Sequence, residues 1–84
     1  MTRERFLELM KRWNIPEDKY SIDERQKGES YVLEKISDNL YAIYYYEMSK
    51  DDMLYFQKLE DAYFALACLI RYHLVDNHKA DIVI

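Results

Sequence analysis

The strongest constraint on the fold is a set of three aromatic-rich segments between residues 30 and 58, with short polar stretches between them. The segments are SYVLEKI (30–36), LYAIYYYE (40–47) and MLYFQK (53–58), and the polar stretches are SDN and MSKDD. Short polar connections of this kind join neighbouring antiparallel strands. The sequence therefore predicts a three-stranded antiparallel meander.

A helix is predicted on each side of this meander. Residues 2–13 place their large apolar side chains on one side at helical spacing, with Thr2 as the N-cap and Asn14 at the end. A second helix begins near 59–61 and runs to about 75–77. It is apolar almost all round, which is typical of a helix that is buried on several sides.

The order α-β-β-β-α predicts an α+β fold with both helices on one face of the sheet. The length of 84 residues suits a single domain, 1–84. Residues 20–22 and 81–84 have strand chemistry, so either is a candidate for one more short strand. The tail at 80–84 is equally a candidate to cover the second helix or to pair with another chain.

The facing of the strands follows from Glu34, because an unpaired carboxylate in the core is costly and this side chain must point outward. Alternation then predicts an inner face and an outer face. The inner face takes Tyr31, Leu33, Tyr41, Ile43, Tyr45, Leu54 and Phe56, and the outer face takes Val32, Ala42, Tyr44, Tyr46, Met53 and Tyr55. The outer face is either an exposed aromatic interaction patch or a set of cross-strand pairs whose hydroxyls meet water.

The charge of the chain argues against nucleic acid as a partner. The formal net charge is −4. Residues 14–84 contain eight basic and fourteen acidic side chains. Phosphate binding needs clustered Lys and Arg, so a basic protein is the better partner. Cys68 is alone, which excludes an internal disulfide and suits a reducing compartment. With neither a signal core nor an apolar span in view, we expect a cytoplasmic protein without membrane contact.

No catalytic, metal or cofactor set is predicted, so we expect a protein that is not an enzyme. His73 and His78 are five positions apart, which is poor spacing for metal ligands, and no second cysteine assists them. Cys68 and His73 are interpreted as core residues. A single Gly leaves no phosphate-binding loop.

Four stretches in order, NIPEDKYSI, ESYVLEK, LYAIYYYE and FQKLEDAYFAL, resemble a family of small immunity proteins from bacterial polymorphic-toxin and contact-dependent inhibition systems. The likeness runs from about Asn14 to Leu66. Its most specific parts are Tyr20-Ser21, the strand at 31–35, and Phe56 six positions before Ala62. The resemblance implies a non-enzymatic inhibitor that binds a cognate toxin domain in the cytoplasm. Such toxins are often nucleases, whose clefts are basic.

The predicted partner-binding residues combine charge with aromatic contact. Glu47, Asp51 and Asp52 supply the charge, Tyr44, Tyr46 and Tyr55 the apolar contact, and Asp23 with Glu24 a second acidic patch. The alternative function is a small self-associating structural or adaptor domain, a homodimer formed through the tyrosine face or the tail, with the acidic turns serving solubility.

Overall fold

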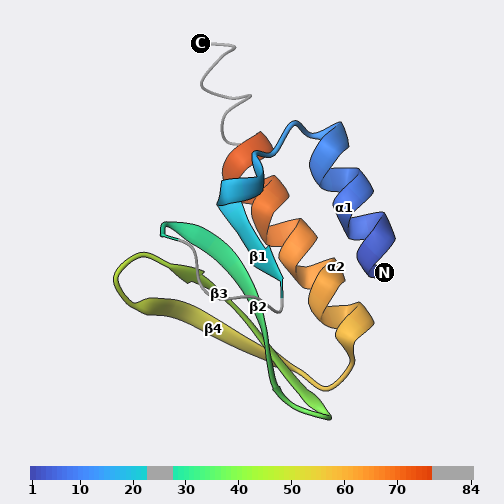
Figure 1. Ribbon diagram of the computed structural model, residues 1–84, viewed down its shortest axis with the longest axis vertical. Coiled ribbons are helices and arrows are strands. Elements are labelled where there is room, and N and C mark those ends of the chain that lie inside the picture. Colours follow the sequence, from blue (N-terminus) through green and yellow to red (C-terminus); the bar gives the residue numbers. More distant parts are fainter. Residues whose placement is uncertain (23–27, 77–84) are drawn as a thin grey trace.

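Two helices cover one face of a four-stranded sheet in the computed structural model (Figure 1). The structure describes residues 1–22 and 28–76, and of Asp51 and Asp52 the backbone only. The helices are α1 (Arg3–Arg12) and α2 (Leu59–Ile70), and a π-helical segment, η2 (Arg71–Asp76), continues α2. The predicted α+β class and the placement of both helices on one face are confirmed.

Helix α1 begins and ends where its sequence signals place it. The amide N–H of Arg5 donates to Oγ1 of Thr2 at 3.1 Å, which is an N-cap hydrogen bond. At the other end Asn14 adopts a left-handed φ of 57°, and the N–H of Ile15 donates to the carbonyl of Met10 at 2.9 Å. This is the Schellman arrangement, which satisfies the last carbonyls of a helix.

The sheet has the order β1-β2-β3-β4. Strands β2 (Ser30–Ser37), β3 (Leu40–Tyr46) and β4 (Lys50–Phe56) form the predicted antiparallel meander. Strand β1 (Tyr20–Ile22) follows the short helix η1 (Glu17–Lys19) and pairs with β2 in parallel. The extra strand therefore lies at 20–22, and the other candidate, 81–84, lies outside the described residues.

Strand β4 begins earlier than predicted, at Lys50 rather than at Met53. Only Glu47–Ser49 separate β3 from β4, and the N–H of Glu47 donates to the carbonyl of Ser49 at 3.1 Å. Met48 completes this tight turn in the left-handed region, with φ of 66°. The polar stretch MSKDD is thus split between turn and strand, and the register shift between Ile43 and Tyr45 absorbs one extra residue on β4.

The main core lies between the helices and the inner face of the sheet. Phe6 of α1 packs edge-on against Tyr20 and also against Tyr63 of α2, with ring centroids 5.7 and 5.6 Å apart. The guanidinium of Arg71 lies 5.5 Å from the centroid of the Trp13 ring, which joins the ends of the two helices. The buried residues of this core are Phe6, Met10, Ile22, Tyr31, Leu33, Ile43, Ala62, Tyr63, Leu66, Ala67 and Ile70.

Helix α2 is less enclosed than its composition predicts. Cys68 is exposed, so its assignment to the core is wrong, and Phe64 and Tyr72 are exposed as well. His73 is also exposed and stacks on Tyr31 at 6.1 Å between ring centroids. The sheet and α1 cover α2 from two directions, and the apolar side chains on its remaining side face solvent. Leu54 was predicted to be in the core but is 52% exposed, because it lies on the edge strand β4.

Candidate partner-binding face

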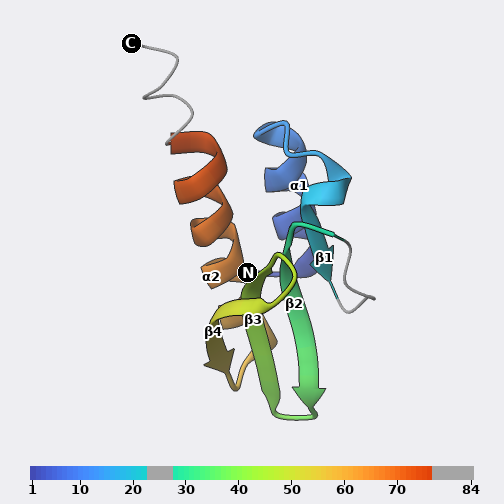
Figure 2. The same cartoon turned by 90° about the vertical axis from the view of Figure 1, so that its left-hand side faces the viewer.

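No helix lies over the outer face of the sheet in the described part of the chain (Figure 2). The facing predicted from Glu34 is confirmed here, because Val32, Ala42 and Tyr44 form a small cluster of their own, separate from the core under the helices. Tyr46 and Met53 pack against this cluster. The turn between β3 and β4 projects on the side away from the helices (Figures 1 and 2).

Tyr44 does not form part of an exposed patch, which corrects the prediction for this residue. Its side chain is 0% exposed, although it points away from the helices. Neighbouring side chains cover it: Val32 lies directly opposite on β2, and Nζ of Lys50 lies 5.2 Å from the centroid of the Tyr44 ring. A central strand position is flanked on both sides, so long neighbouring side chains can bury a ring there without a helix.

Glu34 is a charged residue of this face, on β2 just beyond the last residue that pairs with β1. The hydroxyl of Tyr44 donates to Oε1 of Glu34 at 2.6 Å, and Nζ of Lys50 lies 3.4 Å from the same oxygen. The Tyr44 hydrogen bond is the main reason that the pKa of the Glu34 carboxyl lies below its ordinary value of 4.5. Burial opposes this effect and Lys50 adds to it. The carboxylate is therefore ionised and held in one orientation at neutral pH.

Glu34 sets the predicted facing of the strands, but it was not among the predicted partner-binding residues. The available signal was an acid in the middle of a strand whose same-face neighbours are apolar or aromatic. In the register of the sheet, Glu34 is opposite Ala42, and Ala42 is opposite Tyr55. These three residues form one cross-strand row on the outer face, with the small side chain in the middle.

The other predicted contact residues surround this row and differ in exposure. Tyr55 is 57% exposed, and its hydroxyl lies 3.7 Å from Sδ of Met53. Tyr46 is half-buried, and Glu47 is exposed in the turn beside Met48, which is 95% exposed. The structure therefore places Tyr46, Glu47 and Tyr55 at the surface around the buried cluster.

The predicted acidic residues divide between described and undescribed positions. The backbone of Asp51 and Asp52 belongs to β4, and Asp51 is opposite Tyr45 in the register. Both acids thus follow the turn at the start of an edge strand. The second acidic patch, Asp23 and Glu24, lies outside the described residues.

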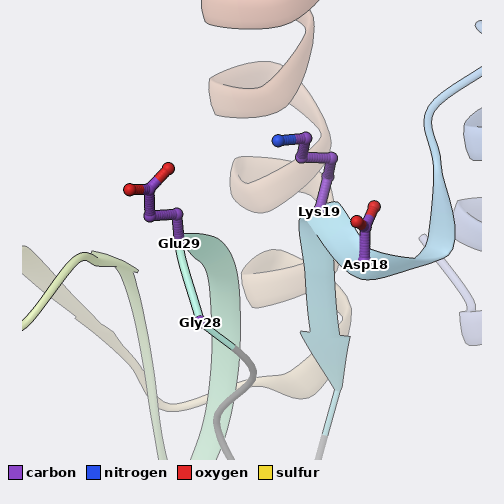
Figure 3. Close-up of a pocket in the computed structure, with 4 residues that line it drawn as sticks. All are labelled: Asp18, Lys19, Gly28 and Glu29. Atoms are coloured by element: carbon purple, nitrogen blue, oxygen red, sulfur yellow. The ribbon is translucent and has the colours of Figure 1, made fainter.

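An open hollow lies where β1 and β2 begin, apart from the residues named above (Figure 3). Asp18, Lys19, Gly28 and Glu29 line it. A β-carbon added at Gly28 would meet no atom within 4 Å, so it would point into open space. Two acids and one lysine on an open surface are the composition of a solvated rim rather than of a catalytic pocket.

Within the described ranges, no three His, Cys, Asp or Glu side chains are grouped so that they could hold a metal ion. The same residues include no helix with the length and apolar character that a membrane crossing requires. Comparison of the chain with protein-family models, with curated proteins and with solved structures finds no match.

Proposed function

We propose that this chain is an immunity protein that binds a cognate bacterial toxin domain in the cytoplasm and neutralises it by stoichiometric occlusion. The observation that carries the proposal is the outer face of the sheet. Neither helix covers it, Glu34 presents an ionised carboxylate on it, Tyr46, Met53 and Tyr55 of the β3–β4 hairpin lie on it, and Glu47 is exposed in the adjoining turn. Exposed aromatic side chains beside charge are typical of protein-binding surfaces. The sequence resemblance to immunity proteins supplies the kind of partner.

The partner that suits this face is basic. Glu34 and Glu47 are acidic residues of this side of the sheet, and Asp51 and Asp52 follow Glu47 along the same hairpin. The formal net charge of −4 has the same sign. Complementary charge speeds the encounter of two proteins and excludes partners of like charge. A nuclease domain, whose cleft accepts phosphate, has the required basic surface.

The test begins with the gene immediately upstream. The C-terminal domain that it encodes is expressed alone and together with this chain, and we expect toxicity alone, rescue together, and a complex with one copy of each chain. A double charge reversal, Asp51→Lys with Asp52→Lys, should weaken that complex by about tenfold or more, since charge pairs at an interface each contribute on the order of a kcal/mol. The folded state should survive, as judged by thermal melting.

A matched control reverses another adjacent acidic pair, Glu17→Lys with Asp18→Lys, in η1. This variant changes the net charge by the same amount, so an equal loss of affinity would show a general charge effect and no site on the hairpin. Unchanged affinity of the Asp51/Asp52 variant, with an unchanged melting curve, would contradict the site. Absence of both rescue and complex formation would contradict the proposed immunity function itself.

A second candidate function, self-association as a structural or adaptor domain, is favoured by one specific observation. Phe64, Cys68 and Tyr72 recur every four residues and form an exposed stripe along α2 and the start of η2. Apolar stripes of this kind mark interfaces. A molar mass from light scattering separates the two functions, because a structural dimer requires twice the chain mass in the absence of any toxin domain.

A further inference from the structure

The sheet has two edge strands, and they differ in how much backbone they offer to a further strand. An edge strand directs the N–H and C=O groups of every second residue away from its neighbour, so these groups can pair with a strand of another chain. Strand β1 forms one edge with only three residues, Tyr20–Ile22. Strand β4 forms the other edge with seven, Lys50–Phe56. Strand β4 is therefore the edge that another strand can extend.

The first half of β4 has features by which proteins protect an exposed edge. Its first three residues, 50–52, are all charged. A bulge follows them, since the register with β3 shifts between Ile43 and Tyr45. Charges repel a strand of like charge, and a bulge interrupts regular pairing along the edge. This half of β4 therefore does not accept a strand indiscriminately.

The second half of β4, residues 53–56, lacks this protection and is called the open segment below. It reads Met-Leu-Tyr-Phe, without charge, proline or glycine, and 54–56 pair with β3 in regular antiparallel register. Leu54 is 52% exposed on the helix side of the sheet, and Tyr55 is 57% exposed on the outer side. Exposed apolar surface thus flanks the backbone edge on both faces. An edge of this kind is a ready position for strand pairing.

The charges beside the open segment favour a strand of a basic partner over a second copy of this chain. A strand that pairs with 53–56 passes positions 51 and 52, both of which are aspartate, when it continues toward the turn. When the open segments of two copies pair with each other, the residues opposite 51 and 52 fall at or beyond Phe56, where β4 ends. A second copy therefore places no basic strand residue beside these acids, and its net charge of −4 repels the first.

We propose that the toxin domain of the proposed function, on which this step rests, contributes an extended strand that pairs with the backbone of β4 at 53–56 and adds a fifth strand to the sheet. In strand addition the backbone hydrogen bonds supply affinity, and alternate side chains supply specificity. The added strand places apolar side chains beside Leu54 on one face and Tyr55 on the other, and basic side chains where it passes 51–52. The binding surface thereby continues from the outer face onto the β4 edge.

Hydrogen–deuterium exchange of backbone amides tests the strand addition directly. The toxin domain encoded immediately upstream is added to the intact chain, and exchange is followed amide by amide by NMR. In the complex, the amides of 53–56 that point away from β3 should exchange about tenfold or more slowly than in the free chain, because a hydrogen-bonded amide exchanges only when its bond opens. The internal control is the other edge, Tyr20–Ile22, whose fast amides should keep their rates.

A pair of variants tests the same edge through affinity. Leu54→Lys places a charge on the open segment and should weaken binding of the toxin domain by about tenfold or more, since charged side chains oppose pairing at an edge. Phe64→Lys makes the same change of charge at a side chain of α2 that is 59% exposed, and it should change affinity by less than about threefold. Both substituted side chains are exposed, and thermal melting verifies that both variants fold.

Each result either supports the strand addition or overturns it. Slower exchange at 53–56 in the complex, with weaker binding by Leu54→Lys than by Phe64→Lys, supports it. A complex in which these amides exchange as in the free chain would overturn the strand addition alone, because the toxin domain would still bind. If the domain does not bind the wild-type chain, the proposed function fails and the strand addition with it. Protection of 53–56 in the chain alone, with twice the chain mass by light scattering, would assign the edge to a second copy instead.

Discussion

The hydrogen bond between Tyr44 and Glu34 allows the change in the free energy of unfolding on substitution of Tyr44 to be predicted. The substitution Tyr44→Phe removes one hydroxyl from a fully buried ring and leaves the apolar packing of that ring intact. The lost contact is a 2.6 Å hydrogen bond to an ionised carboxylate. Hydrogen bonds to charged groups contribute about 1.5–3 kcal/mol.

Solvent reduces this magnitude, because the Glu34 side chain is 36% exposed and water replaces part of the lost contact. We therefore expect Tyr44→Phe to lower the free energy of unfolding by about 1–1.5 kcal/mol at pH 7, which is at or just below the lower end of the range for a charged acceptor. In a domain of this size about 1 kcal/mol corresponds to a decrease in Tm of roughly 4–8 °C. Thermal and urea unfolding followed by circular dichroism measure both quantities.

The pH dependence of this loss has a definite sign. Because the pKa of Glu34 is lowered in the folded state, its stabilising contribution is present above the ordinary value of 4.5 and is lost as the pH falls through the lowered folded value. Wild type and Tyr44→Phe should therefore differ by a constant amount near neutral pH. Their difference should narrow as the pH falls below the ordinary value of 4.5 and through the lowered folded value, where the carboxyl becomes protonated in both proteins.

The control is Tyr55→Phe, which removes a hydroxyl from a ring that is 57% exposed and whose hydroxyl lies 3.7 Å from a thioether sulfur. Substitutions at such surface positions usually change stability by less than about 0.5 kcal/mol. If Tyr44→Phe behaves like Tyr55→Phe at pH 7, the hydroxyl does not hold Glu34. A loss that does not narrow at all as the pH falls below 4.5, over the range in which both proteins stay folded, would equally refute the reasoning, because a neutral carboxyl would then be stabilised as strongly as the ionised one.

Two further predictions concern the ends of local elements. Thr2→Ala removes the N-cap oxygen of α1 and should lower the free energy of unfolding by about 1 kcal/mol, whereas Thr2→Ser, which keeps the oxygen, should leave the Tm nearly unchanged. Met48→Gly relieves a left-handed φ of 66° at a side chain that is 95% exposed, and it should raise stability by about 0.5 kcal/mol after the entropy cost of glycine, while Met48→Ala gives no gain. Urea unfolding at pH 7 measures both, and a destabilised Met48→Gly would show that the Met48 side chain contributes contacts in the turn.

The elements and their facing could be predicted because local signals determine them. Thr2 and Asn14 mark the ends of α1, and the short polar turn before Leu40 requires β2 and β3 to be antiparallel. The cost of burying Glu34 then orients both strands correctly. The predicted start of β4, at Met53, was wrong. A bulge and a turn of three residues carry no sequence pattern that distinguishes Lys50 from a loop residue.

Other features depend on contacts between distant parts of the chain. The parallel pairing of β1 with β2 involves only three residues of β1, Tyr20–Ile22. The alternation of apolar and polar residues does not specify the direction of so short a strand. The exposure of Cys68 follows from which sides of α2 the sheet and α1 cover, and the composition of a helix does not contain that information. The burial of Tyr44 was missed because its cover comes from other strands, with Val32 opposite it on β2 and Lys50 over its ring from β4.

The burial of Tyr44 changes what this residue can contribute to a partner. A ring with no exposed surface makes no direct contact with a docked protein, so under the proposed function the aromatic contact falls to Tyr55 and the half-buried Tyr46. Under the proposed function Tyr44 acts through Glu34 instead, because its hydroxyl fixes the carboxylate on the face proposed to bind the partner. The three consecutive tyrosines of this strand therefore have three separate positions: Tyr45 packs toward the helices, Tyr44 holds the Glu34 carboxylate, and Tyr46 packs at the edge of the proposed binding face.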